Sequence, residues 1–177
     1  MPATDPQPAS TGADWGKASE WHWMNLSCHW RVLGAANDPA IVLIHGFGAS
    51  SSHWRHNAGA LVKAGFQVFS LDLIGFGRSG QPGLSRRFSL DNRLWAEQLA
   101  AFLEEIVQRP AVIVGNSLGG LTAVTTAALR PELVRAAVAA PLPDPTLLTP
   151  LPRRQPTWLI RLKKVAVTLI CRLLPLE

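Results

Sequence analysis

Short apolar runs alternate along this sequence with longer segments in which apolar residues recur every three or four positions. Runs of the first kind predict buried strands, and segments of the second kind predict amphipathic helices. Strands are therefore expected at residues 21–25, 29–32, 41–44, 67–71, 111–115 and 136–140, and helices at 54–64, 90–108 and 118–129. Because strands and helices alternate from residue 41 onward, the pattern predicts an α/β protein whose parallel sheet is covered by helices on both faces.

Composition divides the 177 residues into three parts. Residues 1–14 are expected to form a disordered tail, since they carry neither the apolar stretch of a secretory signal nor the arginines of a transit peptide. Residues 15–145 hold the predicted strands and helices, and their length suits one domain. Prolines then break up the chain, and residues 146–177 form a third part of different composition.

Cysteine and histidine usage gives little support for a metal site. The two cysteines, Cys28 and Cys171, are far apart and show no metal or redox spacing, which favours a reducing, cytoplasmic location. Only His53 and His56 have a spacing that suits a pair of metal ligands. We expect neither a metal nor a cofactor.

Ser117 is the strongest candidate for a catalytic residue. It lies in the sequence GNSLGG at 115–120, directly between a predicted buried strand and a predicted helix. A strand that turns at once into a helix forces the serine into a cramped conformation, which requires glycine on either side. The free N–H groups at the start of the helix suit an oxyanion formed when Ser117 attacks a carbonyl. The pattern predicts acyl transfer, with a plain glycine-rich turn as the alternative.

Two further strand-to-loop junctions carry a related signal. The apolar run at 41–44 is followed by HGFG at 45–48, and the run at 67–71 is followed by DLIGFGRS at 72–79. Taken with GNSLGG, these motifs make the region from about Trp21 to Pro145 resemble an α/β-hydrolase of the serine type. The resemblance implies an α/β-hydrolase fold of which this chain shows the N-terminal part, with about six strands.

The resemblance also implies roles for individual residues. Ser117 would be the nucleophile, and the backbone N–H groups of Phe47 and Leu118 would stabilise the oxyanion. His45 is expected to order the loop rather than to act as a base. The substrate pocket is expected at His45, Gly46, Trp54 and Asn116.

Within the superfamily, the motifs are most similar to the pheophytinase-like and chlorophyll-dephytylase-like branch. That similarity implies a small apolar ester as substrate, with a bulky group such as the phytyl chain of a pigment. Meta-cleavage-product hydrolases also carry a Gly-Asn-Ser elbow, so carbon–carbon bond hydrolysis stays open as an alternative. Epoxide hydrolases and haloalkane dehalogenases have Asp as the elbow nucleophile, and the serine at position 117 disfavours both activities.

The remaining triad members are the difficulty for this interpretation. In α/β-hydrolases the acid and then the histidine follow the serine in the chain. No histidine follows His56, and Asp144 is the only aspartate after Ser117 and hence the only candidate acid of that type. We therefore expect a C-terminally truncated hydrolase that is inactive or incomplete by itself. The alternative is a catalytically dead fragment that binds a ligand or a complementing chain, which would pair with the edge strand at 136–140.

The C-terminal part is apolar and basic. Its lysines and arginines interrupt the run at 158–174 too often for a membrane span, and the net charge of +5 comes largely from here. By resemblance, residues 146–177 would begin a helical cap. Peripheral contact with a membrane through residues 153–174 is an alternative. Basicity without a recognition motif does not predict nucleic-acid binding.

Overall fold

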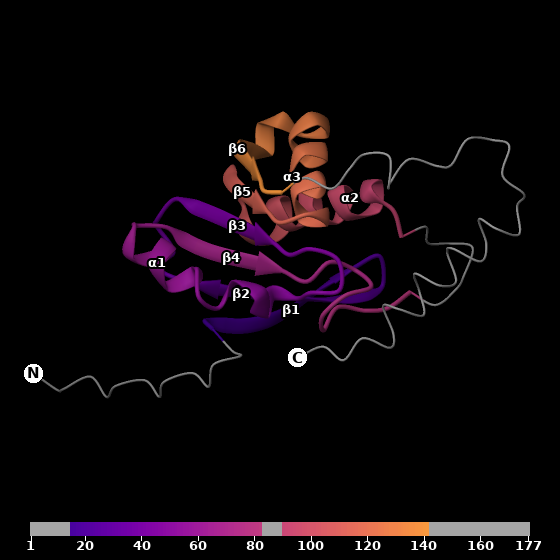
Figure 1. Cartoon of the computed structure of the whole chain (residues 1–177), viewed down its shortest axis with the longest axis horizontal. Coiled ribbons are helices and arrows are strands. Elements are labelled where there is room, and N and C mark those ends of the chain that lie inside the picture. Colours follow the sequence, from indigo (N-terminus) through magenta and orange to yellow (C-terminus); the bar gives the residue numbers. More distant parts are fainter. Residues whose placement is uncertain (1–14, 83–89, 142–177) are drawn as a thin grey trace, which may run out of the picture.

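The computed structural model describes residues 15–82 and 90–141, and these contain a six-stranded mixed sheet (Figure 1). The strands are β1 (Lys17–Trp23), β2 (Leu26–Leu33), β3 (Ala40–Ile44), β4 (Gln67–Leu71), β5 (Ala111–Gly115) and β6 (Val134–Ala139), and their spatial order is β1-β2-β4-β3-β5-β6. Strands β4, β3, β5 and β6 are parallel, as the sequence predicted. The α/β-hydrolase type of architecture expected for the N-terminal part of the fold is confirmed.

The first two strands differ from the others in direction. They form an antiparallel hairpin, and β2 also pairs antiparallel with β4. The turn between them contains Met24 and Asn25, both with positive φ (50° and 62°). Two successive residues of this conformation match the right-handed twist of the adjoining strands.

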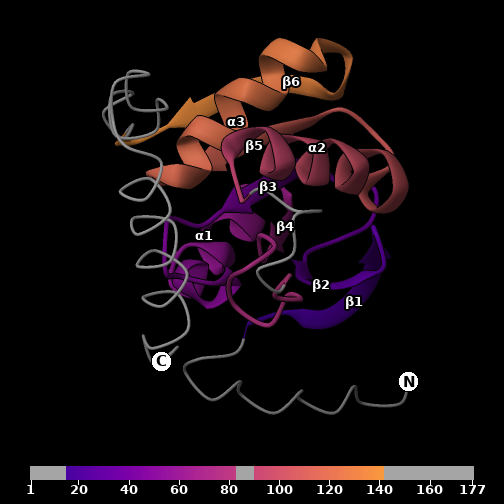
Figure 2. The ribbon, with the colours of Figure 1, turned by 90° about the vertical axis from the view of Figure 1, so that its right-hand side faces the viewer.

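Helices cover both faces of the sheet (Figure 2). On one face lie α2 (Asn92–Phe102), which continues as a π turn over Leu103–Val107, and α3 (Leu118–Leu129). The opposite face carries α1 (Ala58–Lys63) and the 3₁₀ turn Ser51–Trp54. The single helix predicted at 54–64 is thus wrong in its first part, because Trp54 ends the 3₁₀ turn and packs inward before α1 begins.

Each face has its own apolar core. The larger core joins the sheet to α2 and α3 through residues such as Phe102, Leu99 and Ile113, all fully buried. A smaller core under α1 contains Leu43 and Trp54. The two cores hold the parallel strands in place, so that the turns at their carboxyl ends share one edge of the sheet.

Strand β6 forms the edge of the described sheet opposite to β1. It pairs with β5 alone among the described residues, and most of its residues are exposed, including Val138 at 49%. Val124 and Leu129 of α3 are exposed as well, but Leu129 lines a groove with Trp23 and residues of α2 rather than the edge at β6. The edge of the described sheet at β6 therefore presents one large apolar side chain, Val138, to solvent.

Candidate active site

Ser117 has the strained conformation that the sequence predicted for it. Its φ and ψ are 53° and −114°, and a positive φ is uncommon for a residue with a side chain. The turn is held because Asn116 N–H donates to Ile44 O (3.0 Å) and Ser117 N–H donates to Pro141 O (3.0 Å). The backbone around the serine is thereby fixed to β3 and to the residue that follows β6.

Residue 119 must be glycine because α3 starts against β3. A Cβ at this position would collide with the carbonyl of Ile44 and would lie 2.6 Å from the carbonyl oxygen of His45. The helix can therefore begin beside the loop at 45–50 only when residue 119 has no side chain. This contact brings the two predicted parts of the site together.

The loop after β3 lies next to the serine. A Cβ built on Gly46 would be 3.4 Å from Ser117 Cβ and 3.3 Å from the side-chain nitrogen of Asn116. Ser117 is half-buried, and its hydroxyl makes no hydrogen bond with any other described residue. The predicted pocket residues Gly46 and Asn116 are thus adjacent to it.

The two expected oxyanion donors belong to these adjoining segments. Within residues 15–82 and 90–141, neither Phe47 N–H nor Leu118 N–H donates a hydrogen bond. Leu118 is the first residue of α3, where N–H groups lack helical partners and the helix dipole favours negative charge. Both donors are therefore open to a ligand.

The ring of His45 is fully buried, and both of its nitrogens form hydrogen bonds with backbone groups. Leu73 N–H donates to its Nε2 (3.1 Å), so Nδ1 carries the proton and donates to Gly46 O (2.7 Å). Burial lowers the pKa of His45 below its usual value, against the opposing effect of Asp72. A neutral imidazole with both nitrogens engaged cannot accept the proton of Ser117.

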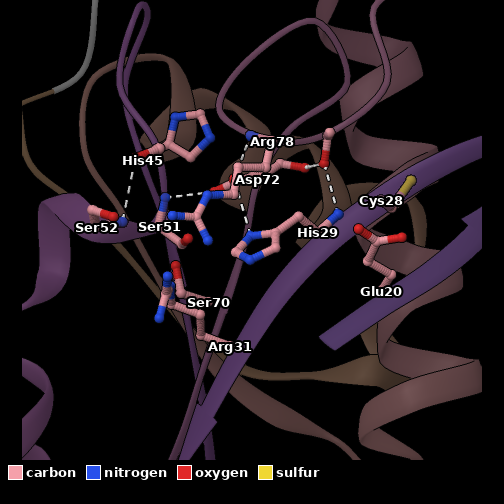
Figure 3. A network of polar contacts seen from close by, with 12 residues as sticks. Glu20, Cys28, His29, Arg31, His45, Ser51, Ser52, Ser70, Asp72 and Arg78 are labelled. Atoms are coloured by element: carbon pink, nitrogen blue, oxygen red, sulfur yellow. Dashed lines mark hydrogen bonds and ion pairs between the residues drawn. The ribbon is translucent and has the colours of Figure 1, made fainter. Parts of the chain in front are cut away.

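Asp72 is the centre of a buried network that sequence reasoning did not assign to the site (Figure 3). Its Oδ1 accepts from Ser51 N–H (2.5 Å), and its Oδ2 accepts from Arg78 N–H (2.8 Å) and contacts His29 Nδ1 (3.1 Å). Burial alone would raise the pKa of Asp72, but these hydrogen bonds and nearby His45 outweigh it and lower the pKa to about 2. The signal in the sequence was an aspartate directly after a buried strand, followed by two alternate glycines.

Aromatic rings lie beside the loop. The Phe47 side chain is 45% exposed, and its ring centroid is 5.3 Å from that of Phe76. The ring of Phe76 in turn packs against the rings of His45 and Trp95, with centroid distances of 5.8 Å in both cases. Trp54 is only 9% exposed and belongs to the small core under α1. Its predicted role in the pocket stays a prediction.

Metal binding, membrane crossing and the C-terminal part of the chain are the remaining points raised by the sequence. No group of three His, Cys, Asp or Glu side chains within these ranges could hold a metal ion. In the same part of the chain, no helix is both long enough and apolar enough to cross a membrane. Asp144, Cys171 and the segment 153–174 lie outside the described residues.

The fold and the turn at Ser117 define the class of protein, and comparison with known proteins identifies the family. The model for the alpha/beta hydrolase fold matches residues 39–158. The chain belongs to this family.

Individual relatives show how broad the family similarity is. The chain is 34% identical over 136 residues to bifunctional epoxide hydrolase 2 of Rattus norvegicus, covering 77% of this chain and 23% of that protein. It is 30% identical over 147 residues to the chloroplastic pheophytinase of Arabidopsis thaliana, covering 66% and 30% of the two chains. The predicted pheophytinase-like branch is therefore not favoured over others.

Solved structures give the same fold. A thioesterase domain from the curacin biosynthetic pathway superposes with a TM-score of 0.71 at 21% identity, covering 86% of this chain and 52% of that domain. At this identity the likeness concerns the fold alone. The chain spans about half the length of that domain and about a quarter of the rat enzyme.

Proposed function

We propose that this chain carries the nucleophile and the oxyanion donors of a serine hydrolase that cleaves carboxylic esters through an acyl-enzyme. The observation that carries the proposal is the strained Ser117, which lies beside the loop after β3 and at the start of α3. The N–H groups of Phe47 in that loop and of Leu118 in α3 have no hydrogen-bond acceptor among the described residues. Relatives range from an epoxide hydrolase to a pheophytinase, so the elbow residue decides the proposed chemistry.

In the proposed reaction, Ser117 Oγ attacks the ester carbonyl and the carbonyl oxygen becomes an anion. The N–H groups of Phe47 and Leu118 stabilise this anion, and collapse of the intermediate releases the alcohol and leaves an acyl group on the serine. Water then attacks the acyl-enzyme, which releases the carboxylic acid and restores the hydroxyl of Ser117. In each step a general base takes the proton of the attacking group and returns it to the leaving oxygen. The aromatic rings of Phe47 and Phe76 favour an apolar acyl or alcohol group next to the serine.

We infer that the general base comes from a polypeptide segment outside the described residues. All five histidines precede position 57; His45 uses both ring nitrogens in its loop, and His29 Nδ1 faces Asp72. Without a base, serine hydrolysis retains only the help of the oxyanion donors and binding, roughly 10³–10⁴-fold over water in the serine-protease case. We infer that full activity requires further sequence or a second chain.

Labelling with a fluorophosphonate tests the proposal. We expect the Ser117 peptide, detected by mass spectrometry, to react faster than the peptide with Ser52, and S117A to lose this fast reaction. The matched control S52A should label as the unchanged protein does. A correctly folded chain in which Ser117 reacts no faster than Ser52 would contradict the assignment of the nucleophile.

A second candidate function is binding of a complementing polypeptide along β6. The observation that favours it is the exposed edge strand β6, in which Val138 is 49% exposed and which pairs with β5 alone among the described residues. An edge strand presents unpaired N–H and C=O groups that can pair with an added strand. The partner would then cover this edge and could supply the missing base.

Light scattering of the purified chain tests this binding surface. We expect the chain to self-associate through the open edge, and V138K to reduce association because a lysine opposes pairing there. The control V124K carries the same change at an exposed valine of α3, outside the edge strand. A wild-type chain that stays monomeric with a cooperative melt would count against the open edge.

A further inference from the structure

The residues on either side of the loop at 46–50 form hydrogen bonds with Leu73 and Asp72, two consecutive residues of the loop at 72–79. At the start of the loop at 46–50, His45 Nε2 accepts from Leu73 N–H (3.1 Å). At its end, Ser51 N–H donates to Asp72 Oδ1 (2.5 Å). Only one backbone hydrogen bond lies within the loop itself, from Ala49 N–H to Gly46 O (3.3 Å). The conformation of Phe47 therefore depends on the hydrogen bonds with Leu73 and Asp72 rather than on bonds inside the loop.

The Asp72 end of this arrangement is itself firmly placed. Asp72 N–H donates to His29 O (2.9 Å), and Asp72 O accepts from Ser79 Oγ (2.7 Å) and Gln98 Nε2 (3.2 Å). The residue is 1% exposed. Its carboxylate is thus a fixed acceptor, and charged acceptors form stronger hydrogen bonds with N–H groups than neutral ones do.

Figure 3 shows the residues that surround this carboxylate: Ser51, Arg78 and His29 come from three different segments, and all lie around Asp72. Oδ1 accepts the hydrogen bond from Ser51 N–H at the end of the loop at 46–50. Oδ2 accepts from Arg78 N–H of the loop at 72–79 and contacts His29 Nδ1 of strand β2. Loss of the first contact would release the end of the loop that carries Phe47 without removing an apolar group from either core.

We propose that Asp72 is a positioning residue, which through Ser51 N–H holds residues 46–50 so that Phe47 N–H points at the oxygen of the carbonyl group whose carbon Ser117 attacks. The inference rests on the proposed function in that Phe47 N–H is taken as an oxyanion donor. Asp72 does not touch the substrate. A purely structural aspartate would stabilise the whole fold without an additional effect on this one loop.

Two variants separate these roles. D72N removes the charge and keeps one carbonyl acceptor. S51P removes the N–H donor together with a buried hydroxyl that makes no hydrogen bond with the described residues. The change lies at the first position of a 3₁₀ turn after the extended residue Ser50 (ψ 179°), where proline is tolerated. The control D38N changes a carboxylate whose side chain makes no hydrogen bond with other described residues.

Hydrogen–deuterium exchange of the 177-residue chain, followed by mass spectrometry, is the main measurement. In S51P we expect amides at 46–50 to exchange about tenfold faster, while amides of α3 change little. In D72N, which also loses the stabilising carboxylate, the amides at 46–50 should accelerate more than those of α3. Ser117 labelling by a fluorophosphonate should slow in the same variants. D38N should match the unchanged protein in both assays.

Unchanged exchange at 46–50 in folded S51P and D72N would overturn the inference, and so would equal acceleration throughout the chain. A wild-type chain whose Ser117 does not label would count against the proposed function, and the exchange measurement would still decide whether Asp72 holds the loop. If D72N does not fold, S51P alone decides.

Discussion

The Asp72 carboxylate occupies the space that a side chain on residue 77 would need. A Cβ built on Gly77 would collide with Asp72 Oδ2 and lie 3.0 Å from Oδ1. Gly77 also has a φ of 55°, which disfavours any residue with a side chain. The loop at 72–79 can therefore wrap around the carboxylate only because residue 77 is glycine.

The first prediction concerns this pair. G77A should destabilise the protein, and the loss should be smaller when Asp72 is shortened to serine, because the shorter side chain makes room. A double-mutant cycle measured by urea unfolding should give an interaction energy of about 1 kcal/mol or more. Additive losses would show that the strain of the positive φ, and not the carboxylate, excludes a side chain. G59A is the control, since a Cβ there meets nothing within 4 Å.

The second prediction concerns the start of α3. G119A should displace the helix from β3, because the new methyl group meets the carbonyls of Ile44 and His45. We expect a loss of stability of about 1–3 kcal/mol and the loss of fast Ser117 labelling. G59A should keep the labelling rate of the unchanged protein. Normal labelling of G119A would mean that the elbow tolerates a shift of its helix.

Much of this fold could be predicted from the pattern of apolar residues. Strands 67–71 and 111–115 and helix 118–129 agree with β4, β5 and α3, because their apolar residues form clear strand or helix patterns, and because glycine or proline lies at the ends of β5 and α3. The division of 54–64 into a 3₁₀ turn and a short helix could not be predicted, since it depends on Trp54 packing into a core formed by distant strands.

The same contrast holds for the candidate site. The turn at Ser117 could be predicted because every requirement lies within six consecutive residues. The network of Asp72 could not, because His29, Ser51 and Arg78 meet only after β2, β4 and the loop at 46–50 are assembled. Spacing along a sequence does not report such distant contacts.

The third prediction is a dependence of stability on acidic pH. The folded pKa of Asp72 is lowered to about 2, so its stabilising effect is complete above the usual aspartate pKa of about 4 and is lost as the pH falls to 2. The effect corresponds to about 2 kcal/mol. Urea unfolding of the wild type and D72N should therefore differ clearly at pH 5 and converge near pH 2. An equal difference at both pH values would contradict the low pKa.

The fourth prediction concerns His45. Because burial lowers its pKa in the folded state, the unfolded chain binds more protons below pH 6.5, and stability should fall as the pH drops through that range. H45Q offers a donor and an acceptor but cannot be protonated, so its melting temperature should change less between pH 7 and 5. H56Q, an exposed control, should follow the wild type. Parallel curves for H45Q and wild type would refute this assignment.

The hydrogen bond from Ser117 N–H to Pro141 O fixes where the polypeptide leaves the described fold. Pro141, the last described residue of the chain, therefore lies beside the serine and not at a remote end of the sheet. Changes in the sequence beyond Pro141, by evolution or by design, would leave the strands and turns that shape the serine unchanged.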